Sequence, residues 1–193
     1  VPGPGPQQRR QAYLATPVST RPDPGPWPGV VVVYEATGPT DDMQEQCDWF
    51  AAAGYLALMP DLYHGRSMVR CVKGTVRQLF AQRGPVFDQL ESARAYLAGR
   101  DDCTGAVGVA GYCLGGGFAL LLAGRGGYDA GAVNYGPLPP NLDEVLAGSC
   151  PLVASFGGRD RSLRGARATL TAAAERAGVP LDVSEYPTAR HAF

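Results

Sequence analysis

The stretch AVGVAGYCLGGGFALLLA, residues 106–123, decides the fold of this chain. Its first five residues are apolar and typical of a strand, and residues 114–123 are typical of a buried helix. Cys113 stands between them, with one glycine two residues before it and another two residues after it. A sharp strand-to-helix turn needs small residues at those two positions, because larger side chains would collide. We therefore predict a nucleophile elbow that carries a cysteine in place of the usual serine.

Strands and helices alternate on both sides of this segment. The expected strands cover residues 30–34, 55–59, 106–110, 130–135, 152–156 and 181–186. The expected helices run from Asp41 or Asp42 to Gly54 and over residues 85–97, 114–123, 142–146 and 164–177. Residues 60–84 are expected to form a long connection with at most one short helix, near residues 75–81. This alternation predicts an α/β fold with a mostly parallel central sheet and helices on both faces.

The length of 193 residues fits a single domain. Residues 1–29 are rich in proline, which disfavours helix, and residues 11–16 are compatible with a short edge strand. We expect residues 1–29 to form an N-terminal segment that packs on the domain. Residues 30–193 are expected to form the one α/β domain.

The composition excludes several classes of protein. Because 17 Lys and Arg stand against 18 Asp and Glu, the formal charge of −1 argues against nucleic-acid binding and against a polybasic membrane binder. No apolar run reaches the roughly 18 residues of a membrane span, and the first residues lack the pattern of a signal peptide, so we expect a cytoplasmic location. Five cysteines without C-x-x-C spacing indicate reduced thiols. With only two histidines, we expect neither a metal nor a cofactor.

Two residues near the C-terminal strands complete a catalytic set with Cys113. The carboxyl ends of parallel strands share one edge of a sheet, where chemistry is usually placed. Asp160 follows the strand 152–156, and His191 follows the strand 181–186. The order nucleophile, acid, histidine is the one that an elbow of this kind expects. Asp160 would orient His191, and His191 would relay protons to and from the thiol; Asp143 and Glu144 are reserve candidates for the acid.

The main chain around Cys113 could stabilise negative charge on the sulfur and on the oxygen of a reacting carbonyl group. A thiol at the start of a helix faces unpaired N–H groups, which favour the thiolate. The N–H of Leu114 would point at an oxyanion formed by attack of the sulfur, and a second donor could come from Ala36, just beyond the strand 30–34.

Glu35 is unusual because it directly follows an all-valine strand. If that strand neighbours the one that leads to Cys113, its carboxylate lies beside the thiol. A half-buried carboxylate is costly unless it has a partner. It could equally be an ordinary acid at the rim of a pocket.

Several segments together resemble the dienelactone hydrolase family, a branch of the α/β-hydrolases. They follow the family order over residues 30–193, about 85% of the chain, and comprise Val30–Glu35, Gly54–Tyr63, Gly108–Gly117, Phe156–Asp160 and Arg190–Phe193. The resemblance implies the α/β-hydrolase fold and a triad of Cys113, His191 and Asp160. It also implies that Glu35 holds the resting thiol neutral and takes its proton when substrate binds.

The resemblance further implies arginines that hold a substrate carboxylate. One such arginine lies in the long connection before the elbow, where this chain offers Arg66, Arg70 and Arg77 without a clear match. A second lies a few residues beyond the histidine, and the sequence ends at Phe193. We expect Tyr135, at the end of the strand 130–135, to contact substrate as well.

We therefore predict a cofactor-independent cysteine hydrolase of a small lactone or ester, of the carboxylic ester hydrolase class, acting as a monomer or homodimer. One alternative is a hydrolase-like module that binds a ligand without turnover, in which Cys113 is an inert small residue. Another is a biosynthetic enzyme that uses the same pocket for cyclisation or acyl transfer. The fold alone does not choose among substrates.

Overall fold

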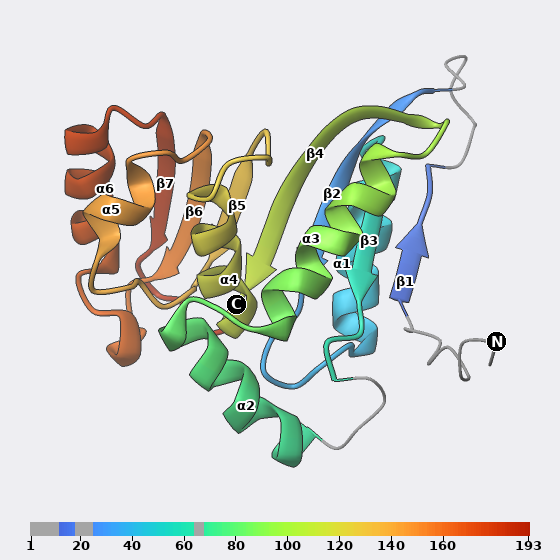
Figure 1. The fold of residues 1–193 in the computed structure, drawn as a ribbon. Helices are drawn as coiled ribbons and strands as arrows, with labels where there is room; N and C mark the ends of the chain where they lie inside the picture. The colour runs from blue at the N-terminus through green and yellow to red at the C-terminus, as the bar shows by residue number, and fades with distance from the viewer. Residues whose placement is uncertain (1–11, 18–24, 64–67) are drawn as a thin grey trace, which may run out of the picture.

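The computed structural model describes residues 12–17, 25–63 and 68–193, with the side chains of residues 68–70 left out. Within these residues, seven strands form one sheet in the order β1-β3-β2-β4-β5-β6-β7 (Figure 1). Only β1 is antiparallel to its neighbour, and all other adjacent pairs are parallel. The strands are β1 Ala12–Ala15, β2 Trp27–Val33, β3 Leu56–Pro60, β4 Cys103–Tyr112, β5 Gly131–Asn134, β6 Leu152–Gly157 and β7 Leu181–Tyr186.

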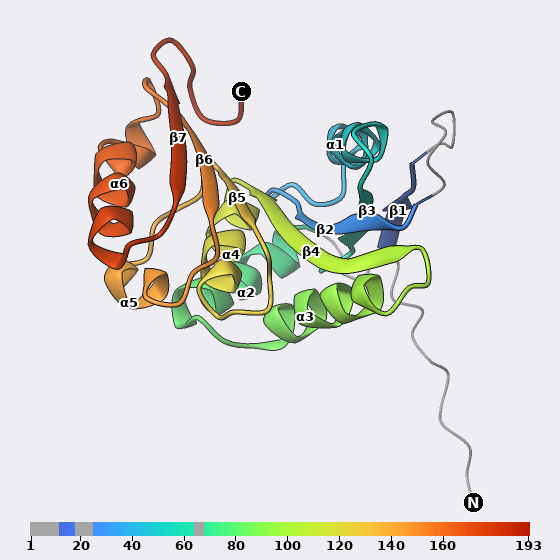
Figure 2. The same ribbon diagram turned by 90° about the horizontal axis from the view of Figure 1, so that it is seen from above.

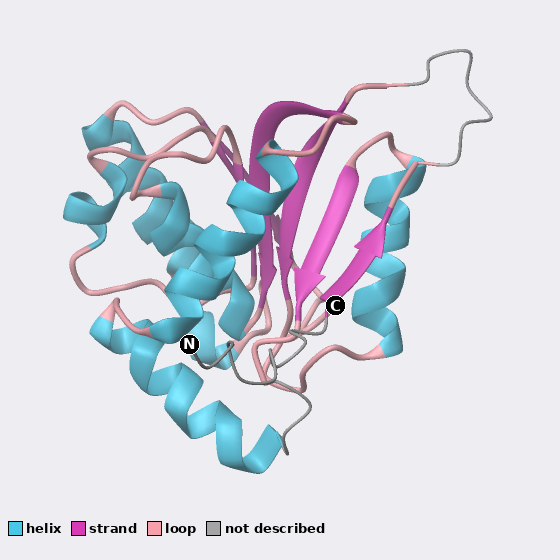
Figure 3. Ribbon diagram, turned by 45° about the vertical axis from the view of Figure 1, so that its right-hand side comes forward, coloured by secondary structure: helices cyan, strands magenta, loops and turns pink. Residues whose placement is uncertain are grey.

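Helices cover both faces of the sheet (Figure 3). Seen from above, α1 lies on one face, and α3 and α4 lie on the opposite face (Figure 2). The helices are α1 Asp41–Ala52, α2 Met68–Ala81, α3 Pro85–Ala98, α4 Leu114–Ala123, α5 Leu142–Leu146 and α6 Ala166–Ala177. This is the predicted α/β architecture, the α/β-hydrolase fold, with a mostly parallel sheet.

The core is densest where β2 and β4 pack against α4. The run Val30–Val33 is buried on both faces of the sheet, as a continuous β-branched strand should be. All ten residues of α4 are buried, although three of them are glycines with low helix propensity. Burial against the sheet therefore stabilises this helix more than the intrinsic preference of its residues does.

The prediction for residues 60–84 was wrong in one respect. The helix there begins at Met68, so it is about twice as long as the one expected near residues 75–81. Thr75 and Leu79 are buried, which gives α2 a helical stripe that packs inward. Gly74 makes this stripe hard to see in the sequence, because glycine lowers helix propensity.

Only part of the proline-rich segment is described. The strand β1 lies at the edge of the sheet, where it pairs with β3, and this confirms the short edge strand expected over residues 11–16. Residues 1–11 and 18–24 lie outside the described residues, so the packing of residues 1–29 on the domain stays a prediction. Among the helices that the structure describes, none has the length and apolar character needed to cross a membrane.

Candidate active site

Cys113 lies at the turn between β4 and α4 with a left-handed backbone, φ 51° and ψ −117°. The two neighbouring glycines are required by close main-chain contacts. A Cβ atom on Gly111 would overlap the backbone oxygen of Gly115, and one on Gly115 would overlap the backbone oxygen of Val33. The elbow therefore fits against the end of β2 only because both positions lack a side chain.

His191 and Asp160 lie beside the thiol, as the order of the strands predicted. The Nε2 atom of His191 is 3.0 Å from Cys113 Sγ, and its Nδ1 atom is 2.5 Å from Asp160 Oδ2. These three residues come from the loops after β4, β6 and β7, at the carboxyl edge of the sheet. Figure 3 shows the C-terminal end of the chain beside the arrowheads of the strands.

The loops that carry Asp160 and His191 are tied to each other. The backbone N–H of Gly158 donates to Tyr186 O, and that of Arg159 donates to Ala189 O, both at 2.9 Å. A Cβ atom on Gly157 would overlap the backbone oxygen of Arg190, so the close approach of the two loops needs a glycine there. The main chain thus sets the distance between the acid and the histidine.

Asp160 is held as a buried carboxylate. Its Oδ1 atom accepts hydrogen bonds from the Ser162 N–H at 2.9 Å and from the Ser162 hydroxyl at 2.6 Å. Burial opposes ionisation of Asp160, but the hydrogen bonds from Ser162 and His191 outweigh it and lower its pKa. The reserve candidate Asp143 is instead exposed and paired with Arg176 at 2.7 Å.

Two backbone amides face the sulfur of Cys113. Burial raises the pKa of this thiol above its ordinary value, and the negative charges of Glu35 and Asp160 raise it further. Hydrogen bonds from the N–H groups of Leu114 and Ala36 act in the opposite direction. Burial and the nearby carboxylates thus favour the neutral thiol, whereas the two backbone donors favour the thiolate.

Glu35 lies two residues beyond the end of β2, which lies beside β4 with Val33 opposite Gly111. The Tyr135 hydroxyl donates to Glu35 Oε1 at 3.0 Å, which provides the partner that a half-buried carboxylate needs. The Tyr135 ring also meets His191 edge-on, with ring centroids 5.3 Å apart. Tyr135, expected from the sequence to contact substrate, thus links Glu35 and His191.

Of the arginines suggested for substrate recognition, Arg66 lies outside the described residues and the side chain of Arg70 is also not described. Arg77 is described, on α2, and its side chain is exposed. No described ion pair or hydrogen bond joins Arg77 to Cys113, Asp160 or His191. In the described part of the chain, no three His, Cys, Asp or Glu side chains gather in a way that could hold a metal ion.

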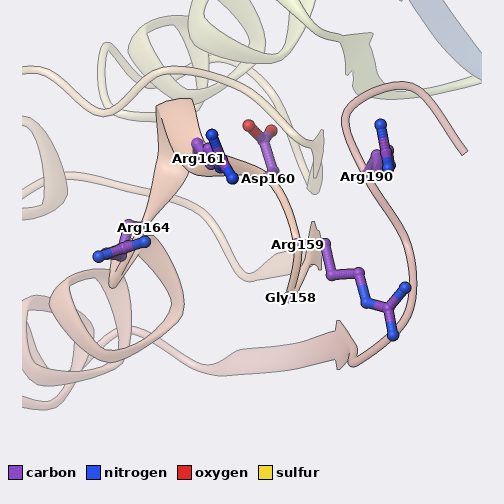
Figure 4. A pocket seen from close by; sticks show the side chains of 6 residues that line it. All are labelled: Gly158, Arg159, Asp160, Arg161, Arg164 and Arg190. Carbon is purple, nitrogen blue, oxygen red and sulfur yellow. The ribbon is translucent and has the colours of Figure 1, made fainter.

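The sequence analysis missed a second group of arginines beside Asp160. These arginines line an open cavity of about 510 Å³, whose lining residues are Gly158, Arg159, Asp160, Arg161, Arg164 and Arg190 (Figure 4). The only signal in the sequence is the spacing of three arginines within residues 159–164. That Arg190 joins them depends on how the last two loops pack.

Comparisons with known proteins identify the family to which this chain belongs. A family model described as the dienelactone hydrolase family matches residues 11–193. Carboxymethylenebutenolidases from Pseudomonas putida and Pseudomonas knackmussii are each 31% identical over 188 residues, which covers 89% of this chain and 77% of theirs. A crystal structure from Klebsiella pneumoniae, assigned to the dienelactone hydrolases, is 26% identical with a TM-score of 0.79. That match covers 94% of this chain and 81% of the other.

Proposed function

Because the chain belongs to the dienelactone hydrolase family and is a hydrolase of carboxylic ester bonds, we propose that it cleaves a small lactone or ester with Cys113 as the nucleophile. His191 acts as general base and acid, and Asp160 orients its ring. The observation that carries this proposal is the continuous series of contacts from Asp160 through His191 to the sulfur, at 2.5 Å and 3.0 Å.

The reaction begins with a protonated thiol, because burial and nearby carboxylates raise the pKa of Cys113. We propose that substrate binding shifts Glu35 so that its carboxylate takes the proton and a thiolate forms. In the resting protein the Tyr135 hydroxyl donates to one oxygen of Glu35 at 3.0 Å, and this hydrogen bond has to shift when Glu35 moves. The thiol would then be unreactive until a substrate fills the pocket.

The thiolate attacks the carbonyl carbon, and the carbonyl oxygen becomes an oxyanion. The N–H groups of Leu114 and Ala36 support this step because both already face the sulfur. The Tyr63 hydroxyl donates to Ala36 O at 2.9 Å and so fixes the orientation of that part of the main chain. When the intermediate collapses, the C–O bond breaks, and the proton that Glu35 took from the thiol passes to the alkoxide that leaves, directly or through His191.

Water completes the cycle. His191 accepts a proton from a water molecule, which attacks the thioester carbon. The C–S bond then breaks, and the thiolate that leaves takes this proton back from His191, so the resting thiol is restored. The products are a carboxylate and an alcohol, which remain parts of one molecule when the substrate is a lactone. The carboxymethylenebutenolidases from Pseudomonas act, by their name, on a lactone of this kind, which supports a small lactone as the substrate class.

The experiment is replacement of the nucleophile. We expect Cys113→Ala to lower kcat/KM for p-nitrophenyl acetate and for a dienelactone by at least about 10⁴-fold. Cys150→Ala is the matched control, because Cys150 is a half-buried free cysteine in another part of the chain. Unchanged turnover in Cys113→Ala would remove the proposal. Product analysis with water and with amine acceptors separates hydrolysis from acyl transfer.

A further inference from the structure

The cavity beside Asp160 carries an uncompensated positive charge. All four of its arginine side chains, Arg159, Arg161, Arg164 and Arg190, are exposed. Within the described part of the chain, none of them makes an ion pair or a side-chain hydrogen bond with an acidic residue. The only carboxylate in the wall is Asp160, whose oxygens already accept from Ser162 and contact His191.

This local charge is opposite in sign to the charge of the whole chain, which is −1. A hollow lined by charges of one sign concentrates the electrostatic potential and raises the local concentration of counter-ions. Guanidinium groups match the oxygens of carboxylates and phosphates and can bind them in a bidentate manner. A volume of about 510 Å³ lies within the usual range for small-molecule sites.

The four arginines approach the cavity from two loops and two sides. In Figure 4, Arg161 and Arg164 lie on one side of Asp160, and Arg159 and Arg190 lie on the other. Three of them belong to the loop after β6, and Arg190 belongs to the loop after β7. The backbone hydrogen bond from Arg159 to Ala189 joins these loops at 2.9 Å, so the arrangement does not rely on side chains alone.

We propose that this cavity binds a small oxyanion with two or more negative charges, of the phosphate or polycarboxylate class. The anion would bridge the loop of Asp160 and the loop of His191 and neutralise the repulsion among the guanidinium groups. It would lie beside Asp160, which lines the cavity, whereas Cys113 and His191 are not among the lining residues. Its source is either a free anion or the charged tail of an ester substrate, and the second source rests on the proposed function.

Calorimetric titration with inorganic pyrophosphate tests the site in the absence of turnover. We expect saturable binding that weakens as the salt concentration rises. The double variant Arg161→Gln and Arg164→Gln should bind pyrophosphate at least about tenfold more weakly, a loss typical of removing charge-assisted hydrogen bonds. The pair Arg159→Gln and Arg190→Gln gives the same test from the other side of the cavity.

The matched control is the double variant Lys73→Gln and Arg83→Gln. It removes the same number of positive charges from exposed positions outside the cavity. We expect it to change pyrophosphate binding by less than about twofold, which is the size of a screened long-range effect. A melting curve for each variant verifies folding. No saturable binding, or an equal loss in the control, would overturn the proposal.

Kinetics then identify the source of the anion. If the anion is a substrate tail, an ester with a terminal phosphate should have a lower KM than p-nitrophenyl acetate. The Arg161 and Arg164 variant should lose this advantage. If the anion is free, pyrophosphate binds but the two esters do not differ in KM. Since calorimetry needs no catalysis, failure of the anion site and failure of the proposed hydrolysis give different results.

Discussion

The nucleophile and the acid–base pair are held in two different ways. Cys113 lies between β4 and a helix that is buried along its whole length, and glycines let backbone touch backbone around it. His191, in contrast, follows the mostly exposed strand β7, and its side chain is 39% exposed. The side chain of Asp160 is only 3% exposed, and its carboxylate accepts from Ser162 and contacts the ring of His191. Burial of a whole helix positions the sulfur, whereas the imidazole is positioned by backbone hydrogen bonds between two loops, by Asp160 and by the ring of Tyr135.

This contrast predicts which replacements affect activity and which affect stability. Changes on the C-terminal loops should alter rate with little loss of stability, because few apolar contacts depend on them. Larger side chains at the glycines of the elbow should mainly lower the free energy of unfolding, because a densely packed region has no room for added volume.

The largest effect after loss of the nucleophile is expected at Asp160. Asp160→Asn keeps the shape of the side chain but removes the charge that selects the tautomer of His191, so kcat/KM for p-nitrophenyl acetate should fall by about 10⁴-fold. Asp143→Asn is the control, because Asp143 is an exposed acid bonded to Arg176. Equal activity of both variants would show that Asp160 does not act through His191.

At the elbow, the expected effect is on stability. Gly115→Ala would place a methyl group against the backbone oxygen of Val33, and we expect a loss of at least about 3 kcal/mol in the free energy of unfolding. The control is Gly74→Ala in α2, where nothing lies within 4 Å of the added atom. That variant should gain about 0.5–1 kcal/mol, because alanine favours helix. Urea unfolding measures both, and an equal response would contradict the role of main-chain packing.

The smallest effect concerns the charge beside the thiol. Glu35 raises the pKa of Cys113, so Glu35→Gln should lower it and shift alkylation by iodoacetamide to lower pH. At neutral pH the labelling rate should rise severalfold, since more of the sulfur is thiolate. Glu45→Gln, at an exposed position on α1, is the control. Peptide mapping measures alkylation of Cys113 separately from that of the other cysteines. If the pH dependence of this alkylation is unchanged in Glu35→Gln, the carboxylate does not act on the thiol.

Much of the fold and of the site could be predicted from the sequence because the decisive residues are local or follow a fixed order. The run of valines in β2 and the apolar residues of α4 mark a buried strand and a buried helix directly. The order of Cys113, Asp160 and His191 along the chain predicted their proximity, because parallel strands end at one edge. The catalytic role of each stays a prediction, as do the cytoplasmic location and the oligomeric state.

Features that depend on the packing of distant loops could not be predicted. The hydrogen bond from Tyr135 to Glu35 joins residues 100 positions apart, and no local pattern indicates it. Helix α2 buries Thr75 and Leu79 against the domain, and this tertiary burial is not visible from the sequence around Gly74. The arginine cavity needs Arg190 to meet the loop after β6, which follows from the pairing of β6 with β7 and from the turn beyond it.

The amides of Leu114 and Ala36 have a consequence for how this enzyme should be mapped genetically. Both groups belong to the main chain, so no exchange of one side chain for another, proline excepted, deletes either donor. A saturation-mutagenesis screen would therefore score both positions mainly by packing, and its proline variants would change the backbone conformation together with the donor. Replacing the peptide linkage before Leu114 by an ester, through chemical semisynthesis, would remove one donor while leaving every side chain intact.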